Sequence, residues 1–199
     1  MVQNTRTKCL DSAEALFAER GFYGVSLAAI AADLELTKQA LLHHFGSKEK
    51  LYGAVLKRIS DRFATLAAAA QTAATRPEDQ LTAYLLQLLS APDQGVSQTR
   101  LLMRELLDNK RRADTAGTWY LQTFLDDLID RVRAVRNWQD ASAAEVLSLV
   151  YQLLGAINYF QVSQPTLEGI YGADGYARLA EAYPEQLARL IRAGLTARP

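Results

Sequence analysis

The sequence predicts an all-α fold of about nine helices. Only 11 glycines and 5 prolines occur in 199 residues, and 49% of the residues are hydrophobic, so helix breakers are scarce and apolar residues are plentiful. Apolar residues recur at helical spacing along most of the chain. The length allows one domain, or a small domain followed by a larger one.

The clearest helical pattern runs from residue 26 to residue 52 and predicts two short helices followed by the start of a long third helix. Ser26 and Thr37 each precede a helical run, where a side-chain hydroxyl can cap the free N–H groups of the first turn. Apolar residues at helical spacing give the two short helices an inward face: Leu27, Ile30, Ala31, Leu34, Leu41 and Phe45. Two capped helices joined by a tight turn predict a helix-turn-helix.

The outward face of the second short helix is rich in hydrogen-bond donors and contains no acidic residue. Its members are Lys38, Gln39, Leu42, His43 and His44. Lys48 follows one turn later, at the start of the next helix. Such a face is typical of the recognition helix of a helix-turn-helix.

The stretch from Leu27 to Lys48 resembles the DNA-binding signature of the TetR family of bacterial transcriptional regulators. The matching segments are IAADLELTK, LLHHF and SKEKLY, which keep the turn, the recognition helix and the next helix start at the family's spacing. The chain departs from the family pattern at Glu35 and Gln39, where glycine is common, and at Leu42 and His44, where aromatic residues are common. If Glu35 adopts a positive φ, as glycine would, we expect a strain of about 1 kcal/mol.

The resemblance implies how this motif would contact a double-stranded DNA operator. Phosphate contacts are implied for one set of residues: Thr37, Lys38, His43, His44 and Lys48. Contacts to base edges are implied for Gln39, Ala40 and Leu42, because Gln can pair with adenine and apolar groups can meet a thymine methyl. Ser26, which caps the preceding helix, belongs to the same candidate DNA-binding set. A protonated imidazole at His43 or His44 would strengthen phosphate contact, so we expect tighter binding below about pH 6.5. The alternative is that both histidines act as neutral hydrogen-bond donors throughout.

The remaining helices follow from apolar stripes and their boundaries. One helix precedes the motif, and the expected helices cover residues 4–20, 47–71, 78–90, 98–107, 114–136, 141–162 and 176–195. Pro184 is expected to break or kink the last helix. The predicted domains are a helix-turn-helix domain over residues 1–46 and a helical effector-binding and dimerisation domain over residues 47–199. Arg100 and Arg104 are expected to form a solvated, ion-paired face with Glu105 and Asp108.

Two long apolar helices at the end of the chain predict a homodimer through a four-helix bundle, an arrangement that the TetR resemblance also implies. The candidate interface residues are Leu153, Ile157, Leu179, Tyr183, Leu187, Leu190 and Ile191. The alternative is that the helix over residues 141–162 is simply buried within one subunit.

A small-molecule effector site is expected in the larger domain. Aromatic walls with a few polar groups are typical of ligand sites, and the candidates are Met103, Trp119, Tyr120, Phe124, Tyr151 and Asn158. Few charges fall at these positions, which favours an apolar, uncharged effector. The alternative is that the same side chains form ordinary core.

Several function classes lack support in the sequence. Cys9 is the only cysteine, so an internal disulfide and a cysteine-based metal site are excluded, and no cofactor is expected. Asp126 and Asp130 are more simply part of a charge network with neighbouring arginines than catalytic, so no enzymatic activity is expected. The uncharged run over residues 146–167 contains several amide side chains and a proline, which disfavours a membrane span. No leader segment opens the sequence, so a cytoplasmic location is expected.

The predicted function is a ligand-responsive DNA-binding transcriptional regulator, a repressor that binds a palindromic operator as a dimer and is released by a small molecule. Residues 1–58 hold 8 basic and 6 acidic residues, a weak excess of positive charge that agrees with local phosphate binding. The alternative is a helical ligand-binding or protein-interaction module that does not bind DNA.

Overall fold

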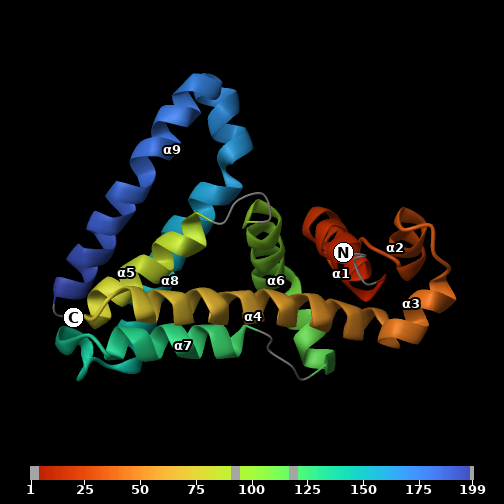
Figure 1. The fold of residues 1–199 in the computed structure, drawn as a ribbon, viewed down its shortest axis with the longest axis horizontal. Helices are drawn as coiled ribbons and strands as arrows, with labels where there is room; N and C mark the ends of the chain where they lie inside the picture. Colours follow the sequence, from red (N-terminus) through yellow and green to blue (C-terminus); the bar gives the residue numbers. More distant parts are fainter. Residues whose placement is uncertain (1–4, 91–94, 117–120, 198–199) are drawn as a thin grey trace. The chain divides into compact units, whose positions relative to one another are not determined.

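The computed structural model describes residues 5–90, 95–116 and 121–197, and within these ranges the fold is all-α, as predicted (Figure 1). The α-helices are α1 (Thr5–Arg20), α2 (Leu27–Asp33), α3 (Lys38–Phe45), α4 (Lys48–Ala73), α5 (Pro77–Leu89), α6 (Gly95–Ala116), α7 (Gln122–Arg133), α8 (Ala143–Val162) and α9 (Gln164–Thr196). A short 3₁₀-helix, Arg136–Trp138, connects α7 to α8.

The chain forms two compact units. The N-terminal unit comprises residues 1–61 and 96–121, and the C-terminal unit comprises residues 62–95 and 122–199. Helix α4 therefore contributes its first part to one unit and its second part to the other. The functional boundary expected between residues 46 and 47 stays a prediction.

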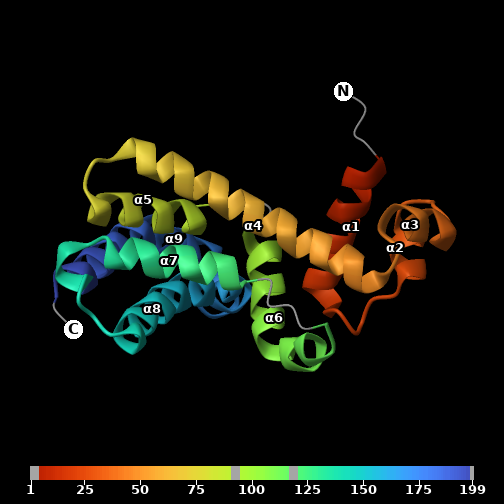
Figure 2. The ribbon, with the colours of Figure 1, turned by 90° about the horizontal axis from the view of Figure 1, so that it is seen from below.

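In the N-terminal unit, α1, α2 and α3 gather around the first turns of α4, and α6 lies beside them (Figures 1 and 2). The side chains at the centre are fully buried and come from α1 to α4: Phe17, Ile30, Leu41, Leu51 and Leu56. These residues belong to the apolar faces seen in the sequence. Their burial stabilises the unit, because removing apolar surface from water contributes about 25 cal/mol per Å².

Each short helix of the motif begins with the predicted cap. The Ser26 hydroxyl accepts a hydrogen bond from the Ala29 N–H at 3.1 Å, and the Thr37 hydroxyl accepts one from the Ala40 N–H at 3.2 Å. Such caps satisfy N–H groups that have no partner inside the helix and contribute about 1 kcal/mol each. The start and direction of α2 and α3 are thus set by local sequence.

The turn between α2 and α3 contains Glu35 at a φ of 54°, which confirms the conformation expected if this residue replaced a turn glycine. Among the described residues, Glu35 alone combines a side chain with positive φ. The Leu36 N–H then donates to the Ala31 carbonyl at 2.8 Å and closes the turn. The tight turn is therefore made at a cost in backbone strain of about 1 kcal/mol.

Helix α6 is a packed member of the N-terminal unit, and the expectation of a solvated face at Arg104 and Glu105 is wrong. Glu105 is buried and accepts a hydrogen bond from the Tyr52 hydroxyl at 2.8 Å. Arg104 donates from Nε to the Ala18 carbonyl at 3.0 Å and from a terminal nitrogen to the Glu19 carbonyl at 2.6 Å. These partners lie more than 50 positions away in sequence, so local patterning could not indicate them.

In the C-terminal unit, α5 packs against α8 and α9, and α7 packs against α5 and α8. The buried residues include Leu81, Leu85, Leu128, Val150 and Ile191. Helix α8 begins with a capping box, in which Ser142 accepts from the Glu145 N–H and Glu145 accepts from the Ser142 N–H. This reciprocal pair satisfies two terminal N–H groups and fixes the helix start.

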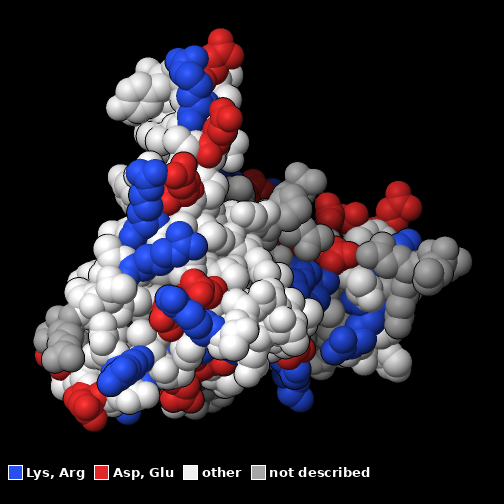
Figure 3. Space-filling view, turned by 60° about the vertical axis from the view of Figure 1, so that its left-hand side comes forward, with Lys and Arg blue, Asp and Glu red and all other residues white. Residues whose placement is uncertain are grey.

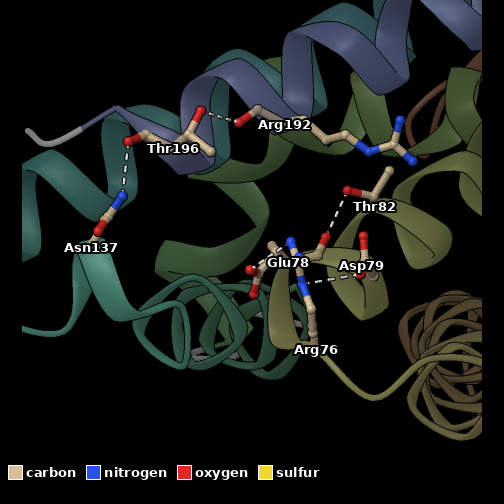
Figure 4. A network of polar contacts seen from close by, with 7 residues as sticks. All are labelled: Arg76, Glu78, Asp79, Thr82, Asn137, Arg192 and Thr196. Carbon is tan, nitrogen blue, oxygen red and sulfur yellow. Dashed lines mark hydrogen bonds and ion pairs between the residues drawn. The ribbon is translucent and has the colours of Figure 1, made fainter.

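Polar contacts secure two ends of this unit (Figure 4). Arg76, just before α5, pairs with Glu78 at 2.9 Å and with Asp79 at 3.3 Å. At the end of α9, the Asn137 amide donates to the Thr196 carbonyl at 2.8 Å. The side chain of Asn137 thereby satisfies one of the carbonyls that a helix C-terminus leaves open.

Helices α1, α4, α5 and α8 lie within three residues of their predicted limits, but three other boundaries differ. Helix α6 extends to Ala116 rather than ending at residue 107, and α7 begins at Gln122 rather than at residue 114. The sequence after Leu107 has no apolar stripe, yet it is rich in Lys, Arg and Ala, which favour helix by intrinsic propensity.

The last helix begins 12 positions earlier than predicted and bends at a different residue. Pro165 occupies the first turn of α9, where proline is tolerated because the missing N–H would have no partner. The break is at Gly172 (φ 73°, ψ 166°), and the bend is visible in Figure 1. At Pro184, where a break or a kink was expected, helical dihedral angles continue, so the helix does not break there; a kink at Pro184 stays a prediction.

Helix α8 is long and apolar enough to cross a membrane, judged by length and composition alone. It is the single such helix in the described ranges, and one helix of this kind is weak evidence for a membrane span. In the structure it packs against α5, α7 and α9.

Candidate nucleic-acid interface

The outer face of α3 is available to a ligand along its whole length. Lys38, Gln39, His43 and His44 are exposed, while Leu41 and Phe45 are buried beneath them. The His43 and His44 rings lie edge to face with centroids 5.6 Å apart. The predicted recognition residues are therefore placed on one accessible surface, and their contact with DNA stays a prediction.

Ala40 and Leu42 are partly exposed and complete this face. Both are predicted to meet base edges, and their exposure leaves small apolar surfaces between the polar ends of Gln39 and His43. Helix α3 contains no acidic residue, so no carboxylate on the helix itself would repel a phosphate.

Lys48 extends the surface at the start of α4. Its ammonium lies 4.4 Å from the centroid of the Phe22 ring, a cation–π contact that holds the long side chain against the unit. Burial lowers the pKa of Lys48, and neighbouring Glu49 partly opposes that change. The charge of Lys48 is thus presented from a defined position rather than from a freely moving side chain.

The N-terminus of α4 adds backbone donors to the same edge. The Ser47 hydroxyl accepts from the Lys50 N–H at 3.2 Å. The Glu49 pKa is lowered, first by a backbone hydrogen bond and then by the hydrogen bond with Ser47. A helix N-terminus carries partial positive charge and suits an anion, so Ser47 and Lys48 are well placed beside α3 for phosphate contact.

The candidate effector residues are only partly located by the structure. Phe124 is buried and packs against Phe63 with ring centroids 4.6 Å apart, Tyr151 is exposed and Asn158 is half-buried. Met103 is half-buried in the N-terminal unit, whereas the other three belong to the C-terminal unit. Trp119 and Tyr120 lie outside the described residues. The effector site stays a prediction.

The candidate dimer residues divide into two groups. Leu153, Ile157, Leu187 and Ile191 are buried within this one chain, and Leu179 and Leu190 are exposed. Tyr183 is half-buried, and its hydroxyl donates to the Ala156 carbonyl at 2.8 Å.

Sequence reasoning missed three other exposed residues on α8: Leu147, Tyr151 and Tyr159 (Tyr151 was proposed only for the effector site). Their separations of four and eight place them on one face of the helix, a signal that was present in the sequence. Figure 3 shows positive and negative side chains interspersed with neutral surface on one side of the molecule. The exposed apolar stripe on α8 is a candidate contact surface.

No cluster of three or more metal-binding side chains occurs within the described parts of the chain. Two capped helices, a strained tight turn and a donor-rich outer helix instead define the N-terminal unit as a helix-turn-helix protein module. Residues 10–55 match the family model for bacterial regulatory proteins of the tetR family. This match shows that the helix-turn-helix segment is similar to the N-terminal domain of that family.

Individual proteins show the same similarity. The HTH-type transcriptional regulator UidR of Escherichia coli is 38% identical over 60 residues, which cover 30% of this chain and 31% of UidR. The HTH-type transcriptional repressor AcnR of Corynebacterium efficiens is 29% identical over 137 residues, covering 67% of this chain and 66% of AcnR. A TetR-like transcriptional regulator from Rhodococcus sp. RHA1 has the same fold, with a TM-score of 0.71, 24% identity and full coverage of both chains.

Proposed function

We propose that this protein is a DNA-binding transcriptional regulator, a repressor that acts from the cytoplasm as a homodimer on a palindromic operator. The observation that carries the proposal is the exposed, acid-free face of the capped helix α3, set within a domain that matches the tetR family. The repressor assignment draws additional support from AcnR, which is named a transcriptional repressor.

The roles on this surface follow from side-chain chemistry. Lys38, His43, His44 and Lys48 would hold phosphates together with Thr37, since cations and hydroxyls bind the DNA backbone and position the protein. Gln39 would read sequence, because its amide can both donate to and accept from adenine. Ala40 and Leu42 would contact thymine methyl groups.

A dimer supplies the symmetry that a palindromic operator requires. Two recognition helices about 34–36 Å apart fit successive turns of one face of the duplex. The exposed stripe on α8, together with Leu179 and Leu190 on α9, supports a contact between two copies through these helices. Their burial in an isologous interface would explain why large apolar side chains face outward in one chain.

A small apolar effector is proposed for the helical domain, with Phe124 and Asn158 among its candidate contacts. An effector that binds one arrangement of the dimer more tightly than another favours that arrangement. DNA affinity then changes through the difference between the effector's affinities for the two arrangements, a coupling of usually about 1–3 kcal/mol.

The test is binding of purified protein to the DNA upstream of its own gene, measured across a salt series. We expect a dimer to protect a pseudo-palindromic site, with affinity falling steeply as salt rises. Lys38→Ala and Lys48→Ala should each weaken binding and lower the salt slope by about one unit, because each removes one phosphate contact. Lys57→Ala is the matched control, since Lys57 is exposed further along α4 and pairs with Asp61.

The outcome also separates the alternative function. A stable dimer that binds no DNA at any salt concentration would leave the fold intact and would favour a ligand-binding or protein-interaction module. The oligomeric state is tested independently by Leu190→Glu, which we expect to yield monomers in sedimentation. Leu107→Glu provides the control, because Leu107 is exposed on α6 in the other unit.

A further inference from the structure

We propose that Arg104 and Glu105 of α6 are positioning residues for DNA binding: they hold the C-terminus of α1 and Tyr52 of α4, and so fix the helices that carry the DNA-contacting face. The proposal rests on the proposed DNA-binding function and adds residues that lie about 60 positions beyond the helix-turn-helix.

The first support is that α6 is integrated into the N-terminal unit. Leu101 and Leu102 are buried, and so are the polar side chains Gln98, Thr99 and Glu105. Burying a carboxylate is costly unless hydrogen bonds compensate for the lost water. A buried Glu105 that is hydrogen-bonded to Tyr52 therefore specifies one geometry of α6 against α4.

The second support is a continuous series of contacts from Glu105 to the proposed interface. The Tyr52 hydroxyl donates to Glu105, and the Tyr52 ring lies edge to face against Phe17 and Phe22 with centroid distances of 5.0 Å. Phe22 in turn lies beneath the Lys48 ammonium. A displaced Tyr52 ring would move Phe22, and with it the support of a proposed phosphate contact.

The third support is the capping of α1 by Arg104. Its guanidinium donates to the carbonyls of Ala18 and Glu19, in the last turn of the helix, where a cation is favoured by the helix dipole. Gly21, at a φ of 72°, ends α1, and the next few residues lead directly to Ser26 and α2. Arg104 thereby anchors the segment that sets where α2 begins.

Neither residue would touch DNA itself. Glu105 is only 3% exposed, and its side chain offers no cation to a phosphate. The Arg104 guanidinium is engaged by the carbonyls of Ala18 and Glu19. A positioning residue changes affinity without changing the number of phosphates neutralised. The salt slope of binding therefore distinguishes this role from a direct contact, because that slope counts neutralised phosphates.

The experiment compares Tyr52→Phe, Glu105→Leu, their double variant and Arg104→Ala in the full chain; leucine has no oxygen that can accept from the Tyr52 hydroxyl. The control is Arg100→Ala, an exposed arginine one turn earlier on the same helix. The probe is a DNA duplex of about 30 base pairs from the region upstream of the gene, long enough for one footprint and its flanks. We expect a loss of about five-fold in affinity for Tyr52→Phe, the equivalent of one net hydrogen bond, with an unchanged salt slope.

The double variant tests whether Tyr52 and Glu105 act together. If they act through their shared hydrogen bond, removing both costs no more than removing either one. Fully additive losses, or a salt slope lowered as in Lys48→Ala, would overturn the positioning role. Affinities equal to that of Arg100→Ala in all four variants would also overturn it.

Amide hydrogen exchange gives a readout that does not depend on DNA. We expect Glu105→Leu and Arg104→Ala to increase exchange in the last turn of α1 and in residues 38–52, with α8 and α9 unchanged. Unchanged exchange in those segments would reject the proposal even if the variants bound DNA less well. If the unmodified protein binds no DNA, the proposed function fails, and the exchange result alone decides whether α6 orders this surface.

Discussion

The Phe160 ring of α8 stacks on the Tyr183 ring of α9, with centroids 3.8 Å apart and planes inclined by 7°. The Tyr183 hydroxyl also donates to the Ala156 carbonyl, so one residue joins the two helices by both a ring contact and a hydrogen bond. Tyr183 was expected at the dimer interface, and these contacts give it a role within one subunit whether or not a partner chain also reaches it.

Replacing Tyr183 with Phe should lower the free energy of unfolding by about 1 kcal/mol, because the ring contact is kept while the hydrogen bond to Ala156 is lost. Urea denaturation of the full chain measures this change. Tyr159→Phe is the control: Tyr159 is 74% exposed, so its variant should fall within about 0.5 kcal/mol of the original protein. Equal stability of the two variants would contradict the assignment.

Stability should decline at alkaline pH. Burial raises the pKa of Tyr183, and burial followed by the charge of Asp127 raises the pKa of Tyr84. The folded state therefore favours the neutral phenols. Their contribution to the free energy of unfolding is fully present below pH 10.0, the ordinary pKa of tyrosine, and is lost as the pH rises above it. Urea unfolding between about pH 9 and pH 11 should show the decline. Tyr183→Phe should decline less steeply, and parallel curves would refute the contribution of Tyr183.

Arg58 links α4 to α1 through two carboxylates. It contacts Asp11 and Glu14 at 2.5 Å each, and Glu14 is only 5% exposed. Arg58→Ala would remove the cation that pairs with the buried Glu14 carboxyl group, so we expect a loss of about 3–5 kcal/mol in stability. Thermal unfolding of the N-terminal unit checks this prediction. The control Lys57→Ala breaks an exposed pair with Asp61 and should cost less than about 1 kcal/mol.

Glu35→Gly should stabilise the N-terminal unit by about 1 kcal/mol, because glycine adopts the positive φ of this turn without a Cβ clash. Glu35→Ala keeps the strained Cβ and should not be stabilising. Both variants remove a negative charge beside the recognition helix, so both should bind DNA more tightly at low salt. Stabilisation by alanine equal to that by glycine would show that backbone strain is not the cause.

His43 and His44 should make DNA binding depend on pH. DNA phosphates favour the protonated imidazoles, so affinity should increase several-fold as the pH falls from about 8 to 5.5 at fixed salt. His43→Gln and His44→Gln should each flatten the profile, since glutamine keeps a hydrogen-bond donor without a titratable charge. A flat profile in the unmodified protein would reject this prediction.

The sequence by itself determined the helices and the outer surface of the motif. Ser26 and Thr37 cap their helices as predicted. These features depend on residues within four positions of one another, so local chemistry is sufficient to define them. The placement of Lys38 and His44 on an exposed face followed from the same helical periodicity.

Only the tertiary structure decided the partners of the polar residues and the position of the bend in the last helix. Arg104 and Glu105 resembled a solvated pair in sequence, yet their partners are backbone carbonyls of α1 and the hydroxyl of Tyr52. Likewise, the helix continues through Pro184 and bends at Gly172. Local conformational preferences amount to only about 1–3 kcal/mol. Packing and hydrogen bonds between segments distant in sequence can therefore override them, and these contacts exist only once the chain is folded.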